Sequence, residues 1–268
     1  MKIFLNSIWF VLAAALLGGC AEKSSNGFQG YIEGEFVYVA APLGGALTRL
    51  AVARGDQVKK GQLLFELERQ SEAAALAQAE NNLAQARSSL ALSESNFRRR
   101  QELRNAPSSV ISAEELDQAR SQRDVDAGQV AALEAALDKA KWSYDQKQQF
   151  SPSDARVHDT LYRSGEWVAA GNPVVALLPP DNLKVRFFVP QAMLPQIKVG
   201  QTVSVQCDGA PRAINAVVNY LSTQAEYTPP VIYSRETRAE LVFMIEAKIP
   251  LADAADVRPG QPADVRLN

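Results

Sequence analysis

The fold of this chain is decided by the stretch Arg54-Gly55-Asp56-Gln57-Val58-Lys59-Lys60-Gly61-Gln62, which returns 110 residues later as Ser164-Gly165-Glu166-Trp167-Val168-Ala169-Ala170-Gly171-Asn172. The similarity extends without a gap over residues 41–67 and 151–177. In both copies, glycine turns separate short apolar runs, and glycine supplies the positive φ that such turns need. Each copy is therefore predicted to form short β-strands joined by tight turns.

The two copies are predicted to form one module rather than two domains. A half of this size cannot bury its apolar side chains alone, whereas two halves that close on each other can. We expect Val58 and Leu64 of the first copy to pack near Val168 and Val175 of the second. The equal spacing of the glycine turns also predicts a pseudo-twofold arrangement.

The residues between the copies have a different pattern, without Pro or Gly from residue 71 to residue 106. Residues at core positions recur every seven positions on both sides of a break at residues 107–109, and this spacing is typical of coiled coils. Two arms joined by a short break predict an antiparallel helical hairpin, each arm roughly 50 Å long. A compact helical domain is the alternative, but the apolar stripe is too narrow to cover a third layer. The heptad positions are Leu76, Leu83, Leu90 and Phe97 before the break, and Leu116, Arg123, Val130, Leu137 and Tyr144 after it.

The Gly-Asp-x-Val-x-x-Gly-Gln pattern of residues 55–62 resembles that of biotinyl and lipoyl carrier domains. A lipoyl-like fold split by a coiled-coil hairpin is similar to the HlyD-type periplasmic adaptors, also called membrane fusion proteins. Residues 182–190, 198–205 and 258–265 resemble the strands and Gly-Gln turns of that family's small β-barrel. The resemblance covers residues 28–268 and implies an elongated, mixed α and β protein with a lipoyl-like β module, a hairpin and a barrel.

This organisation divides the chain into six predicted segments. They are a lipoprotein signal peptide (1–19), an anchor linker with the first barrel-associated strand (20–37), the first lipoyl-like half (38–70), the coiled-coil hairpin (71–150), the second lipoyl-like half (151–180) and the β-barrel domain (181–268).

The N-terminus reads as a signal sequence, with Lys2 followed by an apolar run over residues 8–17. About ten apolar residues are too few for a transmembrane helix, which needs about 20. The ending Leu17-Gly18-Gly19-Cys20 resembles the bacterial lipobox, which implies that Cys20 is lipidated and anchors the mature chain in the periplasm, most consistently at the inner membrane. An ordinary signal peptide with a chance cysteine is the alternative.

Composition argues against several functional classes. The chain has 28 basic and 30 acidic residues, so nothing suggests a nucleic-acid partner. We find no phosphate-binding loop and no Cys/His spacing for a metal, and the single histidine, His158, suggests no active site. Cys207 is predicted to be a buried thiol in a strand. We therefore expect no enzymatic activity, cofactor or metal.

The carrier motif is predicted to be structural. Carrier domains attach biotin or lipoate to a lysine at an exposed turn, but residues 66–71 and the equivalent residues 176–180 contain no lysine. An insertion of about 80 residues at that position would also block a modifying enzyme. A biotin or lipoyl carrier subunit is therefore the less favoured reading of this module.

The hairpin tip is the candidate functional site. Ser112 and Glu115 have the spacing of a capping box, so Ser112 is predicted to begin the second helix. Arg99, Leu103 and Ser112 also resemble, in order, the residues with which adaptors dock onto TolC-like outer-membrane channels. The turn here is about two residues longer than in that pattern. A docking surface and a simple helix cap for Ser112 both remain open.

The resemblance also implies partners. Residues 227–236 resemble a loop of adaptors that serve ABC exporters, and the chain ends soon after the barrel, where RND-type adaptors carry a further domain. Both features favour an inner-membrane ABC permease and ATPase, a TolC-like channel and self-association into a ring, a hexamer in this family. An RND-pump adaptor and a free-standing envelope lipoprotein without catalysis are the alternatives.

Overall fold

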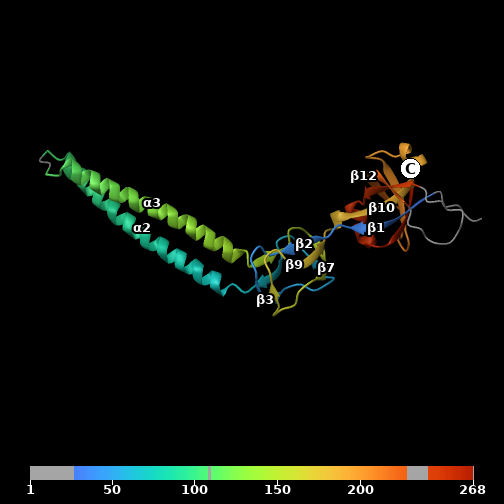
Figure 1. The fold of residues 1–268 in the computed structure, drawn as a ribbon, viewed down its shortest axis with the longest axis horizontal. Helices are drawn as coiled ribbons and strands as arrows, with labels where there is room; N and C mark the ends of the chain where they lie inside the picture. Colours follow the sequence, from blue (N-terminus) through green and yellow to red (C-terminus); the bar gives the residue numbers. More distant parts are fainter. Residues whose placement is uncertain (1–26, 108–109, 228–240, 268) are drawn as a thin grey trace, which may run out of the picture. The chain divides into compact units, whose positions relative to one another are not determined.

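The computed structural model describes residues 27–107, 110–227 and 241–267 (Figure 1). The chain forms two compact units, Glu35–Asn182 and a second unit built from the segment before Glu35 together with the residues from Leu183 onward. The predicted signal peptide, Cys20 and residues 228–236 of the predicted exporter-binding loop lie outside the described residues.

Two four-stranded sheets form the base of the first unit, and each contains strands from both sequence copies. The strand orders are β2-β9-β7-β4 and β6-β5-β3-β8. The strands are β2 (Val37–Ala40), β3 (Gly45–Leu50), β4 (Gln57–Val58), β5 (Leu63–Leu67), β6 (Gln148–Phe150), β7 (Ala155–Thr160), β8 (Trp167–Val168) and β9 (Pro173–Leu178). We call this pair of sheets the sheet module.

The copies are interleaved, because each short turn strand pairs with a strand of the other copy. Gln57 lies opposite Arg156, and Trp167 lies opposite Ala46. The glycine turns of each copy also form backbone hydrogen bonds to the other copy. The Gly55 amide donates to the Val157 carbonyl at 2.9 Å, and the equivalent Gly165 amide donates to the Leu47 carbonyl at 2.8 Å.

Both glycines have nearly the same positive φ, 95° at Gly55 and 94° at Gly165, a conformation that glycine adopts without strain. The repetition of strand pairs, hydrogen bonds and dihedral angles confirms the predicted pseudo-twofold arrangement.

A single apolar core closes the sheet module. Val58, Leu64, Val168 and Val175 all belong to it and are almost wholly buried. Removing such a side chain from water stabilises the fold by about 1.5–3 kcal/mol. The predicted packing of the two copies into one module is therefore confirmed.

The helical hairpin consists of α2 (Gln70–Asn105) and α3 (Ala113–Asp145), which lie side by side (Figure 1). Its contact positions follow the expected heptads, with Leu83, Ala86 and Val130 buried between the helices. Small residues one helical turn from the heptad leucines let the two backbones approach. Arg123 also occupies a heptad position, where its guanidinium lies 4.8 Å from the centre of the Phe97 ring.

The hairpin is fixed to the sheet module at its root by a buried lysine. The Lys147 ammonium lies 2.9 Å from a Glu72 carboxylate oxygen and donates a hydrogen bond of 2.8 Å to the Gly44 carbonyl. Burial would raise the pKa of Glu72, but hydrogen bonds from Lys147 and Ser71 outweigh it and hold that pKa below its usual value. The contact therefore joins the start of α2 and the segment after α3 to the residue that precedes strand β3.

One predicted domain boundary is corrected by these contacts. The hairpin was expected to extend to residue 150, but β6 already pairs with β5 from Gln148 onward. The physical reason is the repeat itself, because β6 is the counterpart of β2, whose backbone also needs a partner along the sheet edge. The module therefore resumes at residue 148.

The second unit is a closed barrel of antiparallel strands in the order β1-β10-β13-β12-β11-β14. Alternate residues along β10 are buried, as the period of two in a strand requires. Cys207 is buried as predicted, and burial raises the pKa of its thiol. The strands are β1 (Phe28–Gly34), β10 (Leu183–Pro190), β11 (Thr202–Cys207), β12 (Ile214–Tyr227), β13 (Leu241–Lys248) and β14 (Pro262–Leu267).

Candidate functional site

The three predicted site residues lie where α2 ends and α3 begins, at the end of the hairpin away from the sheet module (Figure 1). Arg99 and Leu103 are one helical turn apart near the end of α2, and both are exposed. The Arg99 guanidinium donates a 2.8 Å hydrogen bond to the Asn96 side chain on the same helix. It therefore remains on the outside of the hairpin.

Ser112 forms the predicted capping box at the start of α3. Its hydroxyl accepts a hydrogen bond from the Glu115 amide at 3.2 Å, and its own amide donates to the Glu115 carboxylate at 2.9 Å. These bonds satisfy two backbone donors that a helix start leaves unpaired. The bond from the Ser112 amide is the main reason that the pKa of Glu115 lies below its usual value.

Two arginines next to the predicted ones hold the tip together. The Arg100 guanidinium donates to the Glu115 carbonyl at 3.1 Å, and Arg104 donates to the Ile111 carbonyl at 2.5 Å. Sequence reasoning did not single them out. Their spacing of four residues, which places them on one face of the helix just before the break at residues 107–109, was the available signal.

Two pairs of side chains near the end of α2 have different roles. Arg100 reaches across to α3 and Arg104 to the segment just before it, while Arg99 and Leu103, one position earlier in each case, remain exposed. The Arg99 guanidinium donates to Asn96 through one nitrogen, and its remaining N–H groups can bind a carboxylate or carbonyl of another protein.

An exposed apolar side chain missed by the sequence reasoning completes the tip. Val110 is 83% exposed and Leu103 is 49% exposed, on the two sides of the turn. Single exposed aliphatic residues are common on protein surfaces. Two of them on either side of one turn, next to the exposed Arg99 guanidinium, make a small mixed surface suited to contact another protein.

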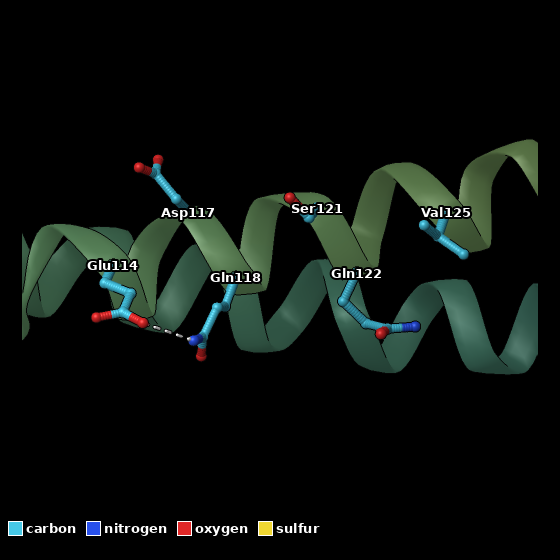
Figure 2. A pocket seen from close by; sticks show the side chains of 6 residues that line it. All are labelled: Glu114, Asp117, Gln118, Ser121, Gln122 and Val125. Carbon is cyan, nitrogen blue, oxygen red and sulfur yellow. Dashed lines mark hydrogen bonds between the residues drawn. The ribbon is translucent and has the colours of Figure 1, made fainter.

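A shallow depression lies along the first turns of α3 (Figure 2). Figure 2 shows its polar side chains in successive helical turns, with the Gln118 amide donating to the Glu114 carboxylate at 3.4 Å. Its lining residues are Glu114, Asp117, Gln118, Ser121, Gln122 and Val125. They offer no nucleophile paired with a base, so we assign no chemistry to this depression.

Within the described residues, no group of three or more His, Cys, Asp or Glu side chains is placed to hold a metal. Among the helices of these described residues, none is long and apolar enough to span a membrane.

Comparisons with known proteins find similarities over the hairpin and over nearly the whole chain. The model of the RND membrane fusion protein α-helical hairpin domain matches residues 75–147, which is most of α2 and α3. A UPF0194 membrane protein of Enterobacter sp. (strain 638) is 27% identical, and the match covers 96% of this chain and 95% of that protein.

Two solved structures have a similar fold. The membrane fusion protein Spr0693 from Streptococcus pneumoniae R6 has a TM-score of 0.64 at 20% identity, over 90% of this chain and 97% of that one. MacA from Actinobacillus actinomycetemcomitans has a TM-score of 0.64 at 19% identity, over 90% of this chain and 78% of that one. Together with the split sheet module, the hairpin and the barrel, these likenesses show that the chain has the fold of these membrane fusion proteins.

Proposed function

We propose that this chain is a periplasmic adaptor that connects an inner-membrane ABC-type exporter to a TolC-like outer-membrane channel, and that the hairpin tip is its channel-docking surface. The observation that supports the proposal is that neighbouring side chains near the end of α2 have different roles. Arg100 and Arg104 hold the tip closed, and Arg99 and Leu103 remain exposed beside them.

The docking chemistry follows from the side chains that remain exposed. Arg99 can donate two parallel hydrogen bonds to a carboxylate or to backbone carbonyls at the end of the channel. Leu103 can fill a small apolar groove beside them, as anchors of helical recognition surfaces do. The Ser112 hydroxyl already donates to the Glu115 carboxylate and accepts from the Glu115 amide, so it can only accept one further hydrogen bond.

The membrane side of the proposal rests on the sequence. Lipidation of Cys20 would anchor the adaptor to the inner membrane, each buried methylene contributing about 0.8 kcal/mol. The resemblance of residues 227–236 favours an ABC-type partner, and a ring of adaptor copies, six in this family, would surround the exporter. An RND-type pump is the second candidate, because the matching hairpin model is that of RND membrane fusion proteins.

The test is a double variant, Arg99→Asp with Leu103→Asp, in cells that contain the exporter and the channel. Reversing the charge and removing the apolar anchor should abolish co-purification of the tagged channel with the adaptor and should stop export. Loss of a buried charge-assisted contact costs about 2–5 kcal/mol at an interface, and a ring repeats that loss. Normal export by the double variant would refute docking at the tip.

A matched control is Arg98→Asp, which places the same change one residue away on an exposed side chain. It should leave channel binding intact. Arg123 would be a poor control, because it packs over the Phe97 ring between the helices. Circular dichroism melting of each variant checks that the hairpin remains folded.

A further inference from the structure

The two pseudo-equivalent turns of the sheet module have the same backbone but opposite surface chemistry. Residues 49–62 and their counterparts 159–172 match in their hydrogen bonds and in the φ angles of their glycines. The carboxylates match as well, since Asp56 accepts from the Ala53 amide and Glu166 accepts from the Arg163 amide, both at 2.8 Å. Both segments therefore need the same backbone hydrogen bonds and glycine conformations to fold. The differences between their exposed side chains need another explanation.

The second turn carries exposed apolar side chains where the first does not. Trp167 is 71% exposed and stands at the position of Gln57, and Leu161 is 46% exposed and stands at the position of Ala51. Neither belongs to the core of the module. The first turn shows that this backbone folds with polar or small residues at both positions. Tryptophan is the residue type most enriched at the energetic centre of protein interfaces.

The charges of the two turns are complementary. Residues 49–62 contain four basic side chains and one acid, whereas residues 159–172 contain one basic side chain and two acids. Lys59 and Lys60 are exposed in the first turn, and exposed Ala169 and Ala170 replace them in the second. The side with the exposed indole is thus weakly acidic, and the other side is strongly basic.

We infer that the Trp167 surface of one copy of this chain packs against the basic turn, Lys59 and Lys60, of a second copy. A lysine ammonium binds favourably over an indole face, and tryptophan is the best aromatic partner for it. The alanines beside Trp167 allow close approach. The opposite charges of the two turns favour this pairing over like-with-like contacts, which would bring two basic turns together.

The topology makes this contact head-to-tail. Strands β4 and β8 are the edges of different sheets, so the basic turn and the Trp167 surface occupy different places on the module. A contact between unlike surfaces can repeat from copy to copy and close into a ring. This inference rests on the proposed function, in which copies of the chain form a ring, and it identifies the surfaces through which neighbouring copies would contact each other.

Cross-linking in membranes tests this pairing with the full-length chain. Ser164→Cys and Gln57→Cys place thiols on the two turns without removing Trp167, Lys59 or Lys60. Each is introduced into a differently tagged copy, the two are co-expressed, and a bismaleimide is added. The expected product is a heterodimer that neither variant forms alone. The native Cys207 thiol is buried and serves as an internal background.

Removal of either side of the contact should then abolish the cross-linked heterodimer. Adding Trp167→Ala, or Lys59→Glu with Lys60→Glu, should weaken association about thirtyfold, as at an interface hot spot. Tyr38→Ala removes another exposed aromatic side chain of the module and should leave the cross-link unchanged. An unchanged cross-link with Trp167→Ala, or a homodimer formed by Ser164→Cys alone, would overturn the inference.

The result is separable from the docking proposal. Export that fails with the Arg99 and Leu103 double variant, together with no heterodimer, would refute this contact and leave channel docking in place. A heterodimer that is sensitive to Trp167→Ala, together with normal export by the tip variant, would support this contact and refute docking.

Discussion

The sheet module and the hairpin belong to one unit, yet they bury their side chains to different depths. In the module, Leu47, Leu64 and Phe65 are wholly excluded from solvent, and all three contribute to one core shared by both sequence copies. In the hairpin, burial is confined to a narrow line between two helices, with Leu83, Ala86 and Val130 at its centre. The chain thus combines a densely packed base with an arm whose surface is almost entirely exposed.

This difference in burial indicates where amino-acid substitutions affect folding and where they affect binding. A module residue contacts partners far away in sequence, so one substitution disturbs both copies. A hairpin residue outside the heptad line contacts mostly its own helix. Substitutions on the arm can therefore alter binding while the fold persists.

The largest effect on stability is expected for Phe65→Ala. Its ring is wholly buried in the module core, and a phenylalanine-to-alanine change at such a site costs about 3–5 kcal/mol. Leu83→Ala in the hairpin should cost less, because solvent and neighbouring side chains can fill the space between two helices. Chemical denaturation of both variants measures the difference, and equal losses would remove the contrast between base and arm.

A smaller loss is expected for Lys147→Met at the junction of the two regions. The substitution leaves the Glu72 carboxylate and the Gly44 carbonyl without their shared donor, at a cost of about 1–3 kcal/mol. Amide hydrogen exchange should increase near residues 70–72 and 145–147 and remain unchanged at the tip. Uniform exchange along the whole hairpin would show that Lys147 does not join the arm to the base.

The smallest effect on stability is expected for Ser112→Ala at the far end of the arm, about 1 kcal/mol for the lost helix cap. Ser112→Asp separates the two functions considered for this residue, because aspartate also caps helices. If Ser112 only caps α3, export by Ser112→Asp is normal. If it contacts the channel, the helix forms and export falls.

The same cap has a pH dependence with a definite sign. Since the pKa of Glu115 is lower in the folded chain than in the unfolded chain, its contribution is present at neutral pH and above the unfolded pKa. It is lost as the pH falls through the folded pKa. Helix content at the tip should therefore decrease in acid more in the native chain than in Glu115→Gln. Identical acid profiles would contradict this role.

Much of the fold could be predicted because its signals are local. The glycine turns, the heptad spacing of Leu76, Leu83 and Leu90, and the capping box of Ser112 and Glu115 each depend on residues within one or two turns of the backbone. The 110-residue repeat then required two similar halves, and their apolar side chains needed each other. These features determined the module, the hairpin and the location of the tip.

The tertiary structure alone decided which distant groups meet. The exchange of turn strands β4 and β8, the burial of Lys147 against Gly44, and the reach of Arg100 to the Glu115 carbonyl all join segments whose separation along the chain carries no periodicity. Likewise, the finished sheet shows how far the Trp167 side chain is exposed. Side-chain exposure and long-range pairing depend on the completed packing, because each is set by neighbours that the local sequence does not specify.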